Sequence, residues 1–123
     1  FSLTHRRGVS IIALADQPVG VDLEFTDSQV EIDAIAARFF APDELKTLRS
    51  PPIDERRDRF FRLWTRKEAF VKALGVGISG AFPGFSALGD TIEAQTRHWT
   101  LESRRVEGAW VSVCIHEPRQ CST

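Results

Sequence analysis

The sequence predicts an α+β domain in which a small antiparallel sheet packs against one long helix. Residues 19–25 alternate between apolar side chains and small or acidic ones, which is the period of a strand. Residues 54–74 repeat apolar side chains at helical spacing. Residues 97–103 and 109–116 alternate again around a turn at 106–108, which is typical of a hairpin. The 123 residues are expected to form a single domain, 1–123, that is long enough to bury a core.

Composition narrows the possible functions of the chain. Its net charge is −1, and seven basic residues against four acidic ones make residues 54–73 locally positive. A basic segment in a near-neutral chain suits a small anion or an acidic partner and argues against general nucleic-acid binding. No apolar run is long enough to span a membrane, and no signal peptide is visible. The two cysteines, to which we assign no role, fit a protein of the reducing cytoplasm.

The elements before the long helix follow from local signals. Residues 1–4 and 9–15 read as extended segments on either side of a polar turn. A first helix is expected to begin at Ser28, with a glutamate three residues later completing a capping box. A second helix is expected to start at Pro42, which suits a first helical position, and to end near Leu48.

The acidic pair in the strand at 19–25 is the first candidate site. Alternation points the apolar residues to one face and puts Asp22 and Glu24 together on the other. Two like charges this close repel each other unless water, a basic partner or a cation relieves them. A solvent-exposed face of an antiparallel sheet would account for the pair, and so would a metal site.

The helix expected from Asp54 to Leu74, with Gly75 as a left-handed cap, carries two ionised residues on its apolar side. At about 100° per residue, Lys67 falls among leucine and phenylalanine side chains, and Glu68 falls between aromatic ones. An unpaired charge that faces a core costs several kcal/mol. Each of these two residues must therefore meet a partner or belong to a site.

If this helix packs across the strand, Asp22, Glu24 and Glu68 converge as three hard oxygen ligands. Three carboxylates without cysteine or histidine beside them suit Mg²⁺, or Mn²⁺, rather than zinc. Lys72 lies one helical turn after Glu68, and a carboxylate-held cation flanked by lysines is a common way to bind phosphates. The glycine-rich residues 76–85 are expected to form a loop whose backbone N–H groups approach an anion.

Three sequence motifs stand in a specific order and separation. They are Gly-Val-Asp-Leu-Glu at 20–24, Phe-x-Pro-x-Glu at 40–44 and Trp-Thr-Arg-Lys-Glu-Ala-Phe-Val-Lys at 64–72. With these motifs the chain resembles the 4′-phosphopantetheinyl transferases, from residue 1 to about residue 85. The opening Ser-Leu-Thr-His is similar to the Asn-x-Ser-His segment of the larger, surfactin-synthetase-activating branch, with Ser2 and Thr4 in place of its usual Asn and Ser.

The resemblance implies a phosphopantetheinyl transferase-like fold and a reaction. Such enzymes move the phosphopantetheine arm of coenzyme A onto a serine of an acyl or peptidyl carrier protein and release 3′,5′-ADP. By position, Asp22, Glu24 and Glu68 would hold Mg²⁺ against the pyrophosphate, and Glu68 would also take the proton of the serine. Lys72 would neutralise the phosphate under attack, and His5 would contact a coenzyme A phosphate.

For Lys67 and for the arginines of residues 56–66, the sequence allows two interpretations. Lys67 is either a further phosphate-binding residue of the coenzyme A site or a partner in a structural ion pair. The arginines of residues 56–66 form either a face for the acidic helix of a carrier protein or a solvated surface. Trp64 is expected to pack rather than to bind ligand, and His98 and His116 are expected to be ordinary strand residues.

The larger branch consists of two similar halves with coenzyme A between them, and this chain resembles the second, C-terminal half. Two arrangements therefore remain: an N-terminal half is missing from this sequence, or copies of the chain pair as a homo-oligomer. The alternative function is a non-catalytic module of the same fold that binds coenzyme A or a carrier protein. An unrelated divalent-metal phosphohydrolase is the third alternative, although such sites usually add histidine or further aspartate.

Overall fold

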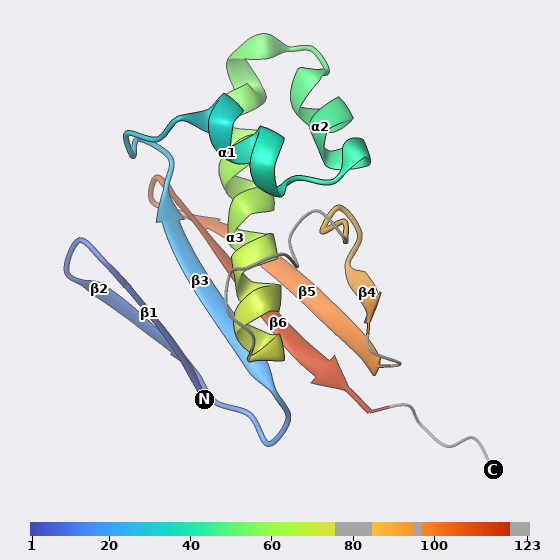
Figure 1. Ribbon diagram of the computed structural model, residues 1–123. Coiled ribbons are helices and arrows are strands. Elements are labelled where there is room, and N and C mark those ends of the chain that lie inside the picture. Colours follow the sequence, from blue (N-terminus) through green and yellow to red (C-terminus); the bar gives the residue numbers. More distant parts are fainter. Residues whose placement is uncertain (76–84, 95–96, 119–123) are drawn as a thin grey trace.

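The computed structural model describes residues 1–75, 85–94 and 97–118 and has the predicted α+β architecture (Figure 1). Its elements in chain order are β1 Ser2–Arg6, β2 Val9–Ala13, β3 Val19–Phe25, α1 Ile32–Phe39, α2 Pro42–Arg49, the 3₁₀ turn η1 Ile53–Glu55, α3 Arg56–Leu74, β4 Thr91–Ala94, β5 Arg97–Val106 and β6 Ala109–Glu117. The main sheet is antiparallel in the order β3–β6–β5–β4. Helix α3 crosses one face of this sheet, while α1 and α2 pack at the N-terminal end of α3.

The predicted extended segments at the N-terminus form the separate hairpin β1–β2. The two strands pair antiparallel, and Arg7 and Gly8 make the turn with φ angles of 50° and 77°. The hairpin lies beside β3, which is an edge strand of the main sheet (Figure 1). The Ser2 hydroxyl accepts a hydrogen bond from the Val21 backbone N–H at 3.0 Å. A side chain of β1 thus satisfies a backbone donor of β3 that faces away from its strand partner.

Helix α1 begins later than the sequence predicts. The expected start was Ser28, but the first helical residue is Ile32, and the side chain of Glu31 makes no capping hydrogen bond. The Ser28 N–H instead donates to the Phe25 carbonyl at 3.1 Å in the turn that ends β3. The capping-box prediction was wrong because the same residues satisfy a strand-ending turn.

The other helix boundaries lie close to the predicted ones. Helix α2 starts at Pro42 as predicted, and the Glu44 carboxylate accepts the Ala41 backbone N–H at its start, at 2.7 Å. Helix α3 begins two residues later than expected and ends at Leu74, and Gly75 adopts the predicted left-handed conformation with φ 74°. Among the described residues, no helix combines the length and apolarity that a membrane span requires.

The C-terminal strands extend the prediction. Strands β5 and β6 are joined at Glu107 and Gly108, both with positive φ, so the predicted hairpin is present with longer arms. Strand β4 was not predicted and pairs with the first residues of β5. Beyond Thr100, β5 therefore has no strand partner on its outer side among the described residues. The predicted glycine-rich loop at 76–85 lies, except for residue 85, outside the described residues.

Among the described residues, two clusters of buried side chains form the core. The first lies between the C-terminal half of α3 and the sheet, with Phe70 and Trp99 at its centre. The second lies between α1, α2 and the N-terminal half of α3, where the rings of Phe40 and Phe60 stack at 5.5 Å. Trp64 packs against these rings, as predicted. Helix α3 belongs to both clusters, so its orientation is set along its whole length.

Candidate metal and phosphate site

A glycine allows α3 to lie directly on β3. A Cβ atom at Gly20 would be 2.0 Å from the Ala69 carbonyl oxygen and 2.6 Å from the Ala73 nitrogen, so no larger residue fits there. Because side chains alternate along a strand, Asp22 lies on the same face of β3 as Gly20. The helical turn that carries Glu68 is thereby brought against the acidic side of the strand.

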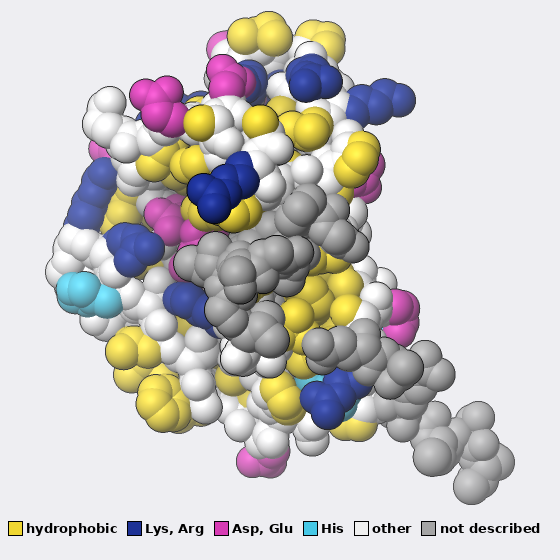
Figure 2. All heavy atoms as spheres, viewed as in Figure 1, with side chains coloured by type: hydrophobic (Ala, Val, Ile, Leu, Met, Phe, Trp, Pro, Cys, Tyr) yellow, Lys and Arg dark blue, Asp and Glu magenta, His cyan; other side chains and the backbone are white. Residues whose placement is uncertain are grey.

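The three carboxylates predicted as metal ligands meet at this contact. One oxygen atom from each of Asp22, Glu24 and Glu68 lies within 4.8 Å of the others. Asp22 is completely buried, Glu24 is nearly so, and Glu68 is partly exposed. The interpretation of the Asp22–Glu24 pair as a solvent-exposed sheet face is therefore wrong. Figure 2 shows acidic and basic side chains close together on the face that carries β3 and α3.

Burial and mutual repulsion make this cluster hold protons in the absence of a cation. Burial, followed by the charges of Glu68 and Glu24, raises the pKa of Asp22 to about 8. Burial and the charge of Glu24 raise the pKa of Glu68 to about 7. Burial also raises the pKa of Glu24, although Arg6 opposes that shift. Two carboxylates in contact need a shared proton unless a cation replaces it.

The chemistry of the cluster fits a hard divalent cation. The Asp22 Oδ2 atom is buried and has no hydrogen-bond partner among the described residues. An unsatisfied buried carboxylate oxygen is costly, and cation ligation is one of the few ways to satisfy it. Three carboxylates without histidine or cysteine are the ligand set expected for Mg²⁺ or Mn²⁺.

Lys72 lies at the rim of the cluster and links three elements. Its Nζ atom is 3.4 Å from Asp22 Oδ1, and it donates to the carbonyl oxygens of Val21 at 3.0 Å and Leu3 at 3.4 Å. One helical turn separates it from Glu68, as the sequence indicated. About a third of the side chain, 35%, is exposed, so the ammonium group is accessible to a ligand that approaches the carboxylates.

Strand β1 carries two further residues of interest, His5 and Arg6. His5, which was expected to contact a phosphate, is exposed, and its Nδ1 shares a hydrogen bond with the Ser10 hydroxyl at 2.8 Å. Arg6 was not singled out from the sequence, yet its Nη2 atom lies 3.3 Å from Glu24 Oε1. Periodicity could not find Arg6, because no local signal places β1 beside β3.

The family profile described as "4′-phosphopantetheinyl transferase superfamily" matches residues 18–122. The chain belongs to this superfamily. Curated relatives include the 4′-phosphopantetheinyl transferases psf-1 of Bacillus pumilus, 41% identical over 71% of this chain, and Sfp of Bacillus subtilis, 37% identical over 70% of it. A further relative, HetI of Nostoc, is 39% identical over 64% of this chain. The resemblance read from the three sequence motifs is thereby confirmed at the level of the superfamily.

This superfamily member spans only part of its relatives and shares its fold with a solved structure. The matches cover 36% of psf-1, 38% of Sfp and 34% of HetI, so the chain spans well under half the length of these curated relatives. The crystal structure of holo-[acyl-carrier-protein] synthase from Neisseria meningitidis superposes with a TM-score of 0.61 over 82% of this chain and 98% of that chain. At 21% identity, this likeness shows the fold alone.

In this phosphopantetheinyl transferase-like chain, Lys67 does not join the carboxylate cluster. Its Nζ atom lies 2.7 Å from Glu44 Oε1, and both side chains are fully buried. Lys67 also donates to the Phe85 carbonyl at 2.8 Å, and Glu44 Oε2 accepts the Ala87 N–H at 2.8 Å. The structural ion pair is the interpretation that the structure supports, which corrects the alternative that placed Lys67 in the coenzyme A site.

The arginines of residues 56–66 are held mostly by the chain itself. Arg57 donates to two carbonyl oxygens in the segment after β3, and Arg59 donates to two in the break before η1. Arg56 pairs with an aspartate of α1, and Arg62 lies over the ring of Trp110. This face therefore offers an acidic partner fewer free guanidinium groups than the sequence suggested.

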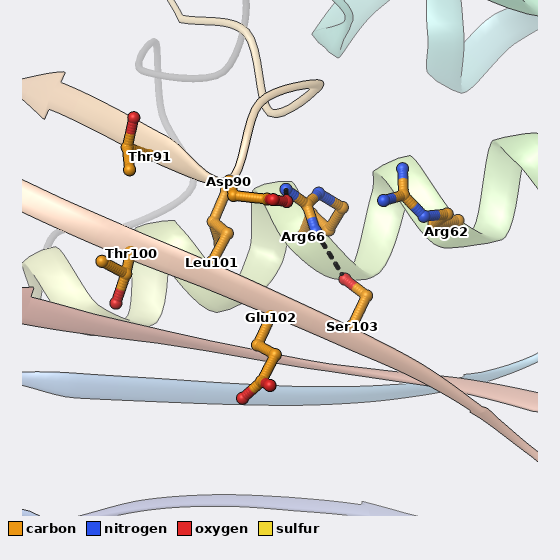
Figure 3. A pocket seen from close by; sticks show the side chains of 8 residues that line it. All are labelled: Arg62, Arg66, Asp90, Thr91, Thr100, Leu101, Glu102 and Ser103. Carbon is orange, nitrogen blue, oxygen red and sulfur yellow. Dashed lines mark hydrogen bonds and ion pairs between the residues drawn. The ribbon is translucent and has the colours of Figure 1, made fainter.

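A cavity of about 420 Å³ lies at the outer edge of β5, and none of the three carboxylates lines it (Figure 3). Its lining residues are Arg62, Arg66, Asp90, Thr91, Thr100, Leu101, Glu102 and Ser103. The fully buried Arg66 donates to the Ser103 hydroxyl at 2.8 Å and to two carbonyl oxygens between α3 and β4. Because the buried charge of Arg66 already has hydrogen-bond partners within the chain, we place the candidate functional site at the carboxylate cluster and not at this cavity.

Proposed function

We propose that this chain supplies the cation-binding and proton-accepting part of a Mg²⁺-dependent 4′-phosphopantetheinyl transferase of the cytoplasm. The reaction moves 4′-phosphopantetheine from coenzyme A to a serine of an acyl or peptidyl carrier protein and releases 3′,5′-ADP. The observation that carries the proposal is the convergence of Asp22, Glu24 and Glu68, with one oxygen of Asp22 left unsatisfied. Membership of the superfamily supports the same reaction.

The residues of this chain account for the charges and the proton in that reaction. The serine oxygen bonds to the β-phosphorus of coenzyme A, the bond from that phosphorus to the bridging oxygen breaks, and the serine proton leaves. Glu68 takes this proton, directly or through water, since it is more exposed than Asp22 or Glu24. A bound divalent cation supplies positive charge to the diphosphate. Lys72 neutralises the phosphoryl oxygens from the exposed rim, and His5 binds a further phosphate of coenzyme A.

We further propose that a second, similar unit completes the coenzyme A site, either as another part of a longer polypeptide or as a second copy of the chain. The matches to relatives such as Sfp cover much less than their full length. The hairpin also exposes apolar side chains on its outer side: Leu3 and Ile12, which pair across its strands, are 50% and 59% exposed, and Phe1 and Leu14 are more exposed still. Such an apolar surface is typical of an interface.

The test is transfer of a labelled phosphopantetheine arm. The purified protein is incubated with fluorescent coenzyme A, Mg²⁺ and an apo carrier protein, and the labelled carrier is measured. We expect transfer by the wild type and transfer that is about 100-fold slower or more with Glu68→Gln, at an unchanged melting temperature. The exposed Glu55→Gln is the matched control and should transfer normally. An unlabelled carrier when the second unit is present, either in the longer polypeptide or as a paired copy, contradicts the assignment, and so does full turnover by E68Q.

The alternative is a non-catalytic module of the same fold that binds coenzyme A or a carrier protein. Two observations support this alternative. The chain spans only part of the length of relatives such as Sfp. The Ser2 hydroxyl already accepts a hydrogen bond from the Val21 N–H. Calorimetry with coenzyme A and Mg²⁺ separates the two functions. Tight binding of coenzyme A without transfer to any carrier favours the module, whereas transfer by the same preparation excludes it.

A further inference from the structure

Arg6 lies at the end of β1, where it joins the N-terminal hairpin to the carboxylate cluster. Its Nη2 atom is 3.3 Å from Glu24 Oε1, and its Nη1 atom donates to the His5 carbonyl at 2.9 Å. The Arg6 side chain is 49% exposed, whereas that of Glu24 is only 11% exposed. The guanidinium group therefore meets the carboxylate on one side and solvent on the other.

The ion pair with Glu24 stabilises the fold too little to explain why an arginine stands at this position. A half-exposed pair at 3.3 Å is screened by water and contributes between nothing and about 1 kcal/mol to stability. This weak attraction concerns the site before any ligand arrives.

The charge balance changes once a divalent cation is held by the cluster. The three carboxylates carry three negative charges. The divalent cation, Lys72 and Arg6 together carry four positive charges, so the site has a net positive charge. Because Glu24 is largely neutralised when it ligates a cation, its attraction for the guanidinium weakens, and donors of Arg6 are left without a partner. A guanidinium with free donors matches the oxygens of a phosphate group in a planar, two-pronged contact.

We propose that Arg6 is a further phosphate-binding residue of this site, and that it exchanges Glu24 for the diphosphate of coenzyme A when a divalent cation is bound. This inference rests on the proposed function, since it assumes the same cation and the same substrate. Arg6 directly follows His5 on β1, so the two side chains point to opposite faces of the strand, and the guanidinium group of Arg6 is the one that lies against Glu24. The role of the hairpin is then to bring this guanidinium group to the exposed side of the carboxylates.

The next residue offers a matched control. The guanidinium of Arg7 pairs with Asp27 at 2.7 Å and lies over the ring of Phe25 at 4.5 Å, and among the described residues it forms no ion pair with the three carboxylates. Arg7→Gln removes the same charge as Arg6→Gln from an adjacent position. It also makes the same change in side-chain size as Arg6→Gln, so the long-range effect of charge is separated from direct contact.

The test measures cation and phosphate binding separately in the whole chain. Mn²⁺ binding is followed by electron paramagnetic resonance, and binding of inorganic pyrophosphate in the presence of Mg²⁺ is followed by calorimetry. For Arg6→Gln we expect Mn²⁺ affinity to be equal or up to about threefold higher, because no guanidinium competes for Glu24. We expect pyrophosphate affinity to fall about tenfold. Arg6→Lys should restore part of the pyrophosphate affinity, and Arg7→Gln should leave both affinities within about twofold of the wild type.

These outcomes distinguish phosphate binding from a structural role. A residue that only supports the fold would lower both affinities together, and this parallel loss would overturn the inference. Pyrophosphate binding by Arg6→Gln within twofold of the wild type would overturn it as well. Should Arg6→Gln fail to fold, Arg6→Lys carries the comparison, because it keeps the charge and loses only the two-pronged geometry.

Two further measurements locate the contact and separate it from the proposed function. Dephospho-coenzyme A lacks the 3′-phosphate, so an equal loss of affinity for it and for coenzyme A in Arg6→Gln supports a contact to the diphosphate. A loss seen only with coenzyme A would place Arg6 on the 3′-phosphate and overturn the assignment. If the wild type transfers phosphopantetheine while Arg6→Gln binds pyrophosphate normally, only the Arg6 inference fails. If the wild type neither transfers nor binds pyrophosphate, both fail.

Discussion

Lys67 and Glu68 are neighbours in the chain, but they serve different parts of the molecule. One residue along a helix turns the side chain by about 100°, so Lys67 points toward α2 and Glu68 points toward β3. The ammonium group of Lys67 meets the Glu44 carboxylate in a fully buried pair. Burial lowers the pKa of Lys67, whereas Glu44 and Asp43 act against this shift. The buried charge is therefore matched within the chain and is not available to a ligand.

Removal of one partner of this pair should be costly. Glu44→Gln leaves the buried ammonium of Lys67 facing a neutral amide, so we expect the free energy of unfolding to fall by about 3 kcal/mol. The double variant Glu44→Gln, Lys67→Met removes both charges and should recover at least about 1 kcal/mol of that loss. Urea denaturation of the two variants measures the difference.

The matched control for this prediction is Lys46→Met on the exposed side of α2. It removes a lysine from the surface and should change the free energy of unfolding by less than about 0.5 kcal/mol. A double variant no more stable than Glu44→Gln would show that the two charges do not depend on each other, contrary to the geometry.

At the scale of elements, the site depends on how closely α3 approaches β3. The missing side chain of Gly20 lets the helix backbone rest on the strand, and the three carboxylates meet beside this contact. The hairpin β1–β2 adds a third element through Ser2 and Lys72, which bridge β1, β3 and α3. Strand and helix contribute ligands that are more than forty residues apart in the chain.

Gly20→Ala should separate these elements. Its Cβ would overlap backbone atoms of α3, which no rotamer change can relieve, so we expect a loss of about 3 kcal/mol in the free energy of unfolding. Mn²⁺ affinity should fall at least about tenfold, because Glu68 moves away from Asp22. Denaturation and paramagnetic resonance measure the two effects.

Gly89→Ala is the control for this substitution. Among the described residues, a Cβ at Gly89 would meet nothing closer than 3.6 Å, which is an ordinary contact, so stability and Mn²⁺ affinity should stay near those of the wild type. Normal Mn²⁺ binding by a folded Gly20→Ala variant would show that the close approach is not needed to assemble the carboxylates.

At the scale of the whole molecule, the carboxylate cluster links stability to pH and to cations. The pKa of Asp22 is about 8 in the folded chain, above the ordinary value of 3.8, so the folded state holds a proton that the unfolded state releases. The free energy of unfolding of the cation-free protein should therefore fall as pH rises from about 4 toward 8. A cation that displaces the proton binds best at the upper end of this range and stabilises the folded state.

Saturating Mg²⁺ should raise the melting temperature by about 5 °C at pH 8 and by less than about 2 °C at pH 5. Asp22→Asn should abolish the Mg²⁺ effect and make the cation-free protein less sensitive to pH, because the buried carboxyl is gone. Thermal melts followed by circular dichroism provide the measurement. The exposed Asp16→Asn should behave like the wild type. An equal Mg²⁺ shift at both pH values would argue against a cation bound by these carboxylates.

Much of the molecule could be predicted where the signal is local. Strict alternation at 19–25, the helical repeat before Gly75 and the hairpin around Gly108 each specify an element by themselves. The four-residue strand β4 carries too short a pattern to be recognised, and it exists because β5 offers it a partner. The start of α1 was misplaced because Ser28 can satisfy either a helix cap or a turn.

The sequence by itself determined that two acidic residues share one face of a strand and that a glutamate and a lysine stand one turn apart on a helix, because side-chain direction follows from the backbone period. Only the tertiary structure decided which groups meet. The close packing of α3 over Gly20 assembles the carboxylates. Lys67 pairs with Glu44 of helix α2, and the position of β1 brings Arg6 to Glu24. These contacts join residues far apart in the chain, and packing between elements, not local periodicity, sets their distances.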